Sequence, residues 1–202
     1  MRFTIALLLT CWLVPSAFAD AVFVQAQSST SVPVAPVKQL SDAAKRSVEL
    51  DHLFAQLHQP KAPDAENAEA KIWTLWMHND SPTAELLLKQ ANVAMGDKAY
   101  ETSETMLDTL LDSYPDYLEA LNKRATLYFN MKRYDEALAD LDKVLEVEPR
   151  HFGALAARGF VCSAQKKYAD AAAAFRDALL INPNMPGVQA ALKQLQHDYP
   201  DI

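Results

Sequence analysis

The chain has 202 residues, with 26 acidic against 19 basic residues and a formal net charge of −7. This length allows one or two domains, and the acidic balance argues against binding to nucleic acid or anionic membranes, because both attract cationic patches. Of the two cysteines, Cys11 lies in a segment that we expect to be removed, so Cys162 alone cannot form an internal disulfide.

The first 19 residues have the pattern of a secretory signal peptide. A single cation precedes an apolar run from Phe3 to Val14, and an A-x-A motif follows that ends at Ala19. A run of about a dozen apolar residues is too short to cross a bilayer comfortably. The pattern therefore predicts cleavage after Ala19 and an exported mature chain, rather than an uncleaved anchor helix.

Two short regions separate the signal peptide from the rest of the chain. Residues 20–40 mix Ala, Ser, Val and Gln with three prolines and show no periodicity, which predicts a flexible leader. Residues 41–79 contain two stretches with apolar residues at helical spacing, separated by the breaker QPKAPD. We interpret residues 41–79 as a helical hairpin whose second helix carries Trp73 and Trp76.

Three units of 34 residues then follow without insertion, at 84–117, 118–151 and 152–185. Small residues at unit positions 8 and 20 let two antiparallel helices approach closely, and a proline at position 32 ends each second helix. No unit can bury its apolar faces alone, so neighbours must stack. The predicted fold is all-α, a short α-solenoid of three helix hairpins. The clearest columns are Ala91, Ala125 and Gly159 at position 8, Ser103, Ala137 and Ala171 at position 20, and Pro115, Pro149 and Pro183 at position 32.

The two ends of this array need cover. Residues 186–199 have an apolar stripe that includes Val188 and Leu195 and an otherwise polar surface, which predicts a C-terminal capping helix. The hairpin at 41–79 is the matching candidate for an N-terminal cap or degenerate repeat, with Trp73 and Trp76 at positions 24 and 27. The sequence leaves open whether this hairpin caps the array or has a binding role.

The repeated columns resemble the tetratricopeptide repeat (TPR), a helix-turn-helix unit of 34 residues, over about half of the chain. Position 7 departs from the family pattern, since Gln90, Arg124 and Arg158 stand where leucine is common. The stretches NKRATLYF and EPRHFGAL are also similar to those of small exported TPR proteins of proteobacteria. This resemblance implies a location in the periplasm, with secretion as the alternative.

The TPR resemblance implies that the first helices line a concave face that holds a peptide or protein partner. Apolar anchors and amides that pair with a peptide backbone suit this role. The implied function is an interaction scaffold or adaptor, with envelope assembly as one setting; the alternative is a structural solenoid that self-associates. The expected peptide-contact residues are Leu88, Lys89, Asn92, Met95, Asn122, Lys123, Thr126, Phe129, Asn130 and Phe160.

Some TPR domains grip a C-terminal carboxylate with Lys, Arg and Asn at five sites of the groove. By resemblance these sites correspond to Leu88, Asn92, Lys123, Gly153 and Ala157. Only Asn92 fits and Lys123 fits in part, so we reject a chaperone-tail clamp.

Four cationic or histidine residues are candidates for structural pairing or for an anion site. A buried guanidinium without a partner is costly, so the position-7 arginines should meet carboxylates. We expect Arg124 to join the first two repeats through Glu104 and Asp108, and we interpret Asp140 and Asp142 as solvated charges. The four candidates are Arg124, Arg158, Arg150 and His151.

The sequence contains no HExxH, CxxC, Gly-rich phosphate loop or G-x-S-x-G motif, and its five histidines are scattered. We therefore expect neither a metal nor another cofactor. A binding protein is favoured over an enzyme.

Overall fold

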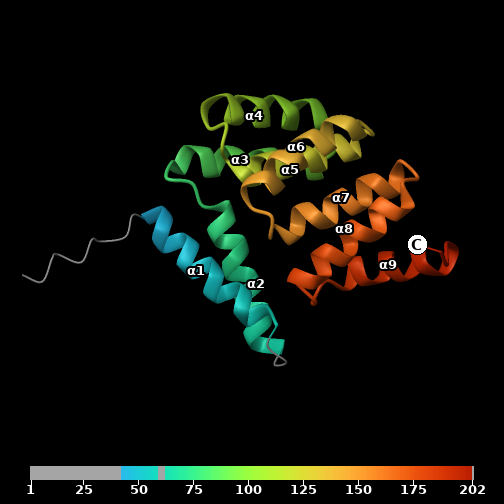
Figure 1. Cartoon of the computed structure of the whole chain (residues 1–202). Helices are drawn as coiled ribbons and strands as arrows, with labels where there is room; N and C mark the ends of the chain where they lie inside the picture. The colour runs from blue at the N-terminus through green and yellow to red at the C-terminus, as the bar shows by residue number, and fades with distance from the viewer. Residues whose placement is uncertain (1–41, 59–61, 202) are drawn as a thin grey trace, which may run out of the picture. The chain divides into compact units, whose positions relative to one another are not determined.

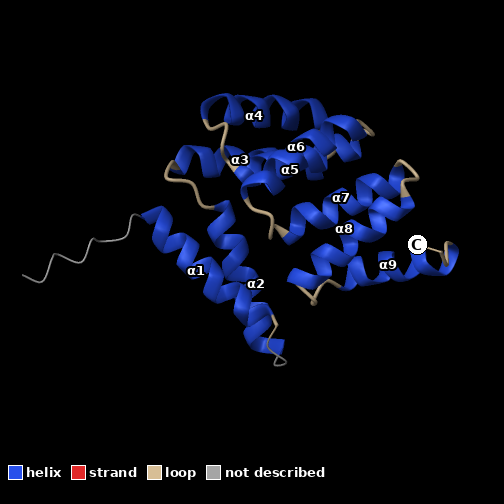
Figure 2. Ribbon diagram, in the orientation of Figure 1, coloured by secondary structure: helices blue, strands red, loops and turns tan. Residues whose placement is uncertain are grey.

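The computed structural model describes residues 42–58 and 62–201, and every regular element in this part of the chain is a helix (Figures 1 and 2). The predicted signal peptide and leader, residues 1–40, lie outside the described residues. Within the described ranges no helix is long and apolar enough to cross a membrane. The helices are α1 Asp42–Leu57, α2 Ala62–Met77, α3 Pro82–Gly96, α4 Tyr100–Ser113, α5 Leu118–Asn130, α6 Tyr134–Val147, α7 Phe152–Ala164, α8 Tyr168–Ile181 and α9 Pro186–Asp198.

Helix pairs α3–α4, α5–α6 and α7–α8 pack as hairpins, and each hairpin contacts the next one. The second and third hairpins begin at Leu118 and Phe152, the first positions of their 34-residue units, and the second helices begin at the repeated tyrosines Tyr100, Tyr134 and Tyr168. The prediction of an all-α solenoid of stacked helix hairpins is confirmed.

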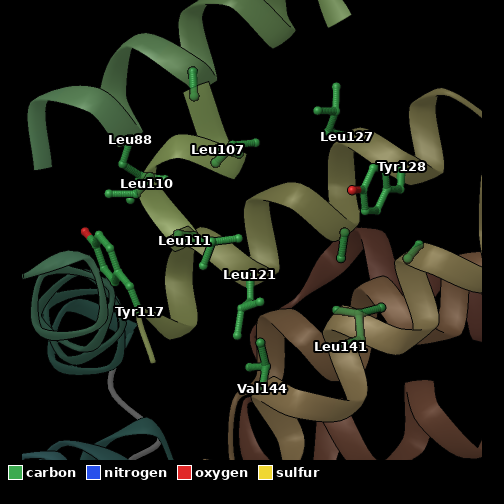
Figure 3. Close-up of a cluster of buried hydrophobic side chains, with 14 of the residues drawn as sticks. Leu88, Leu107, Leu110, Leu111, Tyr117, Leu121, Leu127, Tyr128, Leu141 and Val144 are labelled. Carbon is green, nitrogen blue, oxygen red and sulfur yellow. The ribbon is translucent and has the colours of Figure 1, made fainter. Parts of the chain in front are cut away.

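The small residues at positions 8 and 20 lie where the two helices of a hairpin meet. Ala91, Ala125 and Ala137 are buried, with no more than 1% of their surface exposed. In the first repeat Ser103 replaces alanine, and its hydroxyl donates a hydrogen bond to the carbonyl of Ala91 at 2.9 Å. Figure 3 shows the leucines of α3 to α6 that fill the space around these contacts, including Leu107. Side-chain size therefore sets how closely the helices approach.

The third repeat combines a smaller residue at position 8 with a larger side chain at position 24. Gly159 stands at position 8, and a Cβ atom there would overlap the ring of Phe175 on α8. In the second repeat the same two positions hold Ala125 and Leu141, both buried. The glycine therefore makes room for the larger ring.

Gly159→Ala is expected to lower the free energy of unfolding by about 1–3 kcal/mol through overpacking, despite the better helix propensity of alanine. In a Phe175→Leu background the same change should be neutral or stabilising, because the pair then matches the second repeat. Urea unfolding of the four proteins of this double-mutant cycle measures the coupling. Equal destabilisation in both backgrounds would contradict the size argument.

The turn between the two helices of each repeat has the same backbone shape. Lys98, Lys132 and Lys166, all at unit position 15, have φ angles of 61–62°. This left-handed conformation closes each first helix, and residues other than glycine adopt it at a cost. The repetition of the units thus extends to the backbone dihedrals.

The two ends of the array differ. Helix α9 packs against α8 and buries Val188 and Leu195. The hairpin of α1 and α2, in contrast, packs with its residues Leu53 and Trp76 against Phe152 at the start of α7. The N-terminal hairpin therefore binds to the first helices of the second and third repeats.

Candidate interaction surface

Helices α3, α5 and α7 contact one another in sequence order. We call the surface that they present the first-helix face. The N-terminal halves of these helices form the N-terminal half of the face, which meets the α1–α2 hairpin. The C-terminal halves of the helices form the C-terminal half of the face, which includes exposed residues such as Asn130 and Phe160. All ten residues predicted to contact a peptide belong to these three helices: Leu88, Lys89, Asn92 and Met95 on α3, Asn122, Lys123, Thr126, Phe129 and Asn130 on α5, and Phe160 on α7.

Two tryptophans of α2 fix the hairpin on the N-terminal half of the face. The indole of Trp76 stacks on the His151 ring, with centroids 3.9 Å apart and planes 10° apart. Trp73 meets His151 and Phe152 edge to face, at 5.8 and 5.4 Å between centroids. Such aromatic contacts stabilise beyond the area that they bury.

Gly153 lets Trp73 approach the backbone of α7. A Cβ atom at this position would overlap the indole ring of Trp73. On the other side, the ammonium of Lys123 lies 5.6 Å from the Trp73 ring centroid, within the range of a cation–π contact. Helix α2 therefore docks on α7 at a residue that has no side chain.

Four further contacts tie the hairpin to the repeats. The Tyr117 hydroxyl donates a hydrogen bond to the carbonyl of Met77. His58 contacts the carbonyl of Leu180 through Nε2 at 2.8 Å. At the other contacts, Arg150 pairs with Asp51 at 2.6 Å, and the side-chain amide of Asn184 donates to the carbonyl of Leu57 at 3.4 Å.

Glu119 is fully buried at the start of α5 and shares its carboxylate with three neighbours. Lys123 Nζ lies 2.8 Å from Oε1, Asn122 Nδ2 donates to Oε2 at 3.1 Å, and His151 Nε2 lies 3.4 Å from Oε2. The backbone N–H of Ala154 donates to His151 Nδ1 at 3.1 Å. In the neutral ring, Nε2 therefore carries the proton and faces Glu119.

Burial alone would raise the pKa of the Glu119 carboxyl, but the interactions with His151 and Lys123 outweigh it and hold this pKa below its usual value of 4.5. A lowered pKa in the folded state means that the ionised carboxylate stabilises the fold. That contribution is present above about pH 4.5 and is lost as the pH falls through the folded-state pKa.

Glu119→Gln is expected to lower the free energy of unfolding by about 2 kcal/mol at pH 7, because hydrogen bonds to a charged group are lost. The difference in the free energy of unfolding between wild type and variant should decrease as the pH falls below 4.5. Urea unfolding at several pH values measures it, with the exposed Glu146→Gln as the matched control. A gap that stays constant down to the acid limit would contradict the role of the carboxylate.

Two predicted peptide-contact residues are not accessible. Leu88 has none of its surface exposed and packs in the core with Leu110, and Asn122 is 4% exposed and bonded to Glu119. The interpretation of Leu88 as an anchor and Asn122 as a backbone-pairing amide on an open surface is therefore wrong. Both side chains face inward, because the neighbouring helices cover them. Lys123 is half-buried and already paired.

Accessible residues remain on the C-terminal half of the face. The Phe160 ring is 40% exposed and leans edge to face on Phe175 at 4.9 Å. Phe129 is half-buried beside Tyr134, at 6.0 Å between ring centroids. The remaining predicted contact residues of α3 and α5 are half-buried or exposed: Lys89, Asn92, Met95, Thr126 and Asn130. Their role in peptide contact stays a prediction.

Arg124 is paired on both sides. It forms a bidentate pair with Asp140 at 2.7 and 2.9 Å, and it contacts Asp108 on the preceding repeat at 2.8 Å. The hydrogen bond with Asp140 is the main cause that raises the pKa of Arg124. Asp108 is the partner that the sequence predicted, but Glu104 instead pairs with Arg133 at 2.6 Å.

The interpretation of Asp140 as a solvated charge is wrong, since the residue is 3% exposed.

The other candidates for an anion site are also paired. Arg158 contacts Asp142 on the preceding repeat at 2.8 Å, as Arg124 contacts Asp108. Arg150 pairs with Glu148 at 3.0 Å, and its guanidinium lies 4.4 Å from the Phe54 ring centroid. Together with the buried His151, each candidate for an anion site has a partner within the protein.

Among the described residues no group of three or more His, Cys, Asp or Glu side chains could hold a metal ion. Cys162 is buried and unpaired, and burial raises the pKa of its thiol. A thiol with a raised pKa is a poor nucleophile.

The arrangement of hairpins defines a class of protein, the α-solenoids built from helix pairs. Within this class, residues 118–151 match the tetratricopeptide repeat family. No curated protein sequence matches the chain.

Solved structures show the same fold. The first TPR of Spaghetti (RPAP3), bound to the HSP90 peptide SRMEEVD, is 21% identical, covers 61% of this chain and 98% of its own, and superposes with a TM-score of 0.57. The Arabidopsis OM64 TPR domain is 21% identical, with coverage of 57% and 95% and a TM-score of 0.54. The Sgt2 TPR domain of Aspergillus fumigatus is 20% identical, with coverage of 60% and 82% and a TM-score of 0.57. The fold of the described residues is therefore that of a TPR solenoid.

Proposed function

We propose that this chain is an exported interaction scaffold that holds a peptide segment or a partner protein on the C-terminal half of the first-helix face. The single observation that carries the proposal is the docking of α2 on the N-terminal half of the same face. There Trp73 and Trp76 insert beside His151 and Gly153. A surface that binds one helix through aromatic anchors supports a similar role for its C-terminal half, which the described residues leave accessible.

The side chains on the C-terminal half of the first-helix face favour a peptide segment with apolar residues. Met95, Phe129 and Phe160 supply apolar contacts, and the amides of Asn92 and Asn130 can pair with backbone groups. Charged side chains are scarce there, so an ionic ligand would find few partners. We expect a segment with apolar side chains in extended or helical form.

An acidic C-terminal peptide is a poor fit. The RPAP3 domain binds the peptide SRMEEVD, but here Lys123 is paired with Glu119 and Gly153 lies under Trp73. A carboxylate would therefore meet one engaged ammonium and no further cation at these sites. This observation supports the rejection of a chaperone-tail clamp.

The location follows from the predicted signal peptide, which supports export to the periplasm, with secretion as the alternative, and envelope assembly as one setting. The rival role is a structural solenoid that self-associates through its ends, and exposed Trp73 and Trp76 side chains would support it. Trp76 is 7% exposed and Trp73 is half-buried, so the tryptophans do not provide this support. Nothing in the described side chains favours catalysis.

Capture of partners from a native envelope extract tests the proposal. Phe160→Ala combined with Asn130→Ala should reduce the captured partner at least tenfold, because an apolar anchor and a backbone-pairing amide are lost. Leu180→Ala is the matched control, since Leu180 is 74% exposed on α8 and away from the face. Circular dichroism and thermal melting verify that both variants are folded. Equal capture by the double variant and wild type would remove the site from this face.

A further inference from the structure

The outer face of α3 carries a stripe of exposed residues, two of them apolar, that no described element covers. Leu86, Gln90, Val93 and Asp97 follow one another at the spacing of a single helix face. Leu86 is 56% exposed and Val93 is 58% exposed. Together with Met106 of α4 they line a shallow hollow of about 490 Å³.

The same unit positions are buried in the other two repeats. Position 3 holds Leu86, Ala120 and Ala154, and the two alanines have no exposed surface. Position 10 holds Val93, Leu127 and Val161, and the last two are at most 1% exposed. In those repeats the preceding hairpin covers the columns. The outer face of α3 is therefore a repeat-to-repeat interface without its preceding unit.

A second copy of the chain cannot supply that preceding unit head to tail. The surface that would cover α3 in such a stack is the far side of the third repeat. In the described residues α9 already occupies it and buries Val188 and Leu195 there. What a second copy can offer is its own outer face of α3, in an isologous contact that closes after two copies.

The charges at the hollow fit such a contact. The charged residues that line it are one cation, Lys89, and one anion, Asp97, so this face is neutral while the chain carries a net charge of −7. Two copies can therefore meet here without the repulsion that their net charge would cause elsewhere. In an antiparallel helix pair, Leu86 of one copy would lie near Val93 of the other.

We propose that two copies of this chain associate through the outer faces of α3, around Leu86, Gln90 and Val93. The contact is small: α3 has 15 residues, a length of about 22 Å, and a standard interface buries about 1,600 Å² in total. The dimer should therefore be weak, with a Kd of about micromolar or above. The proposal does not depend on the peptide role of the first-helix face, because Leu86, Gln90 and Val93 are not among the predicted peptide-contact residues and only Lys89 borders both surfaces.

Sedimentation equilibrium of the full purified protein tests the proposal over about two orders of magnitude of concentration around 10 μM. Wild type should show a reversible monomer–dimer equilibrium. Val93→Lys should weaken the dimer at least tenfold, because two ammonium groups would be placed in an apolar contact. Leu180→Lys is the control, because Leu180 is an exposed apolar residue on α8 (74% against 58% for Val93), and this variant should dimerise like wild type.

Three outcomes would overturn the proposal. These are a wild-type protein that stays monomeric over the whole range, a Val93→Lys variant that dimerises as strongly as the control, and assemblies larger than a dimer. The first would leave the stripe to another occupant, and the last would indicate head-to-tail growth. Loss of partner capture by Phe160→Ala is measured separately, so the two proposals fail independently.

Discussion

Arg124→Leu is expected to lower the free energy of unfolding by about 3–5 kcal/mol, because it leaves a buried carboxylate without its partner. Asp140 is 3% exposed, and both of its oxygens accept hydrogen bonds from the guanidinium. Its other neighbouring cation, Lys143 Nζ, lies 3.5 Å away on an exposed side chain and is a weak substitute. Urea unfolding followed by circular dichroism measures the change.

Arg158→Leu is the matched control, since Arg158 occupies the same unit position with a single exposed ion pair to Asp142. Its loss should cost at most about 1 kcal/mol. The double variant Arg124→Leu, Asp140→Leu should recover most of the lost stability, because no charge is then left buried. If Arg124→Leu costs no more than the control, Arg124 does not hold the second repeat together.

Trp76→Ala is expected to cost about 3–5 kcal/mol, as for other large buried aromatic side chains. Trp76 is 7% exposed, stacks on His151, and lies 5.0 Å from Phe152 between ring centroids. The cavity would open where the hairpin docks on α7. Hydrogen exchange in α1 and α2 should therefore accelerate more than exchange in α5 to α8.

Met77→Ala is the control for this change, because Met77 is the next residue on α2 and is 38% exposed. Its effect should stay within about 0.5 kcal/mol. If Trp76→Ala were as mild as Met77→Ala, another contact would have to hold the hairpin. Uniform acceleration across all repeats would show that the hairpin does not open separately.

The fold was predictable because the same packing constraints recur in each of the three repeats. The columns at positions 8, 20 and 32 recur three times, and each recurrence constrains the same close approach or helix end. Arg124 is an intermediate case. Its position predicted a carboxylate partner on the preceding helix, which is Asp108. The burial of Asp140 was not predicted. The two-residue spacing between Asp140 and Asp142 shows only that they point to different sides of their own helix, and it does not show which side another helix covers.

The docking of α2 was not predictable from columns, because it occurs once. Trp73 and Trp76 were assigned to degenerate repeat positions, whereas they contact His151 and Phe152, far along the chain. One available signal was Gly153, a glycine in the first turn of a helix, where the absent side chain admits the indole ring. The burial of Glu119 beside His151 follows from the same contact and shares its unpredictability.

The docked hairpin also affects the order in which the chain can fold. A solenoid whose units touch only their neighbours can form progressively from either end. Here the hairpin is tied to residues that follow much later, since Arg150, Leu180 and Asn184 contact it across sequence separations of 99, 122 and 127 residues. Contacts of such long range raise the contact order and slow folding. Helices α1 and α2, which leave the ribosome before the three repeats, are thus among the last to reach their final position.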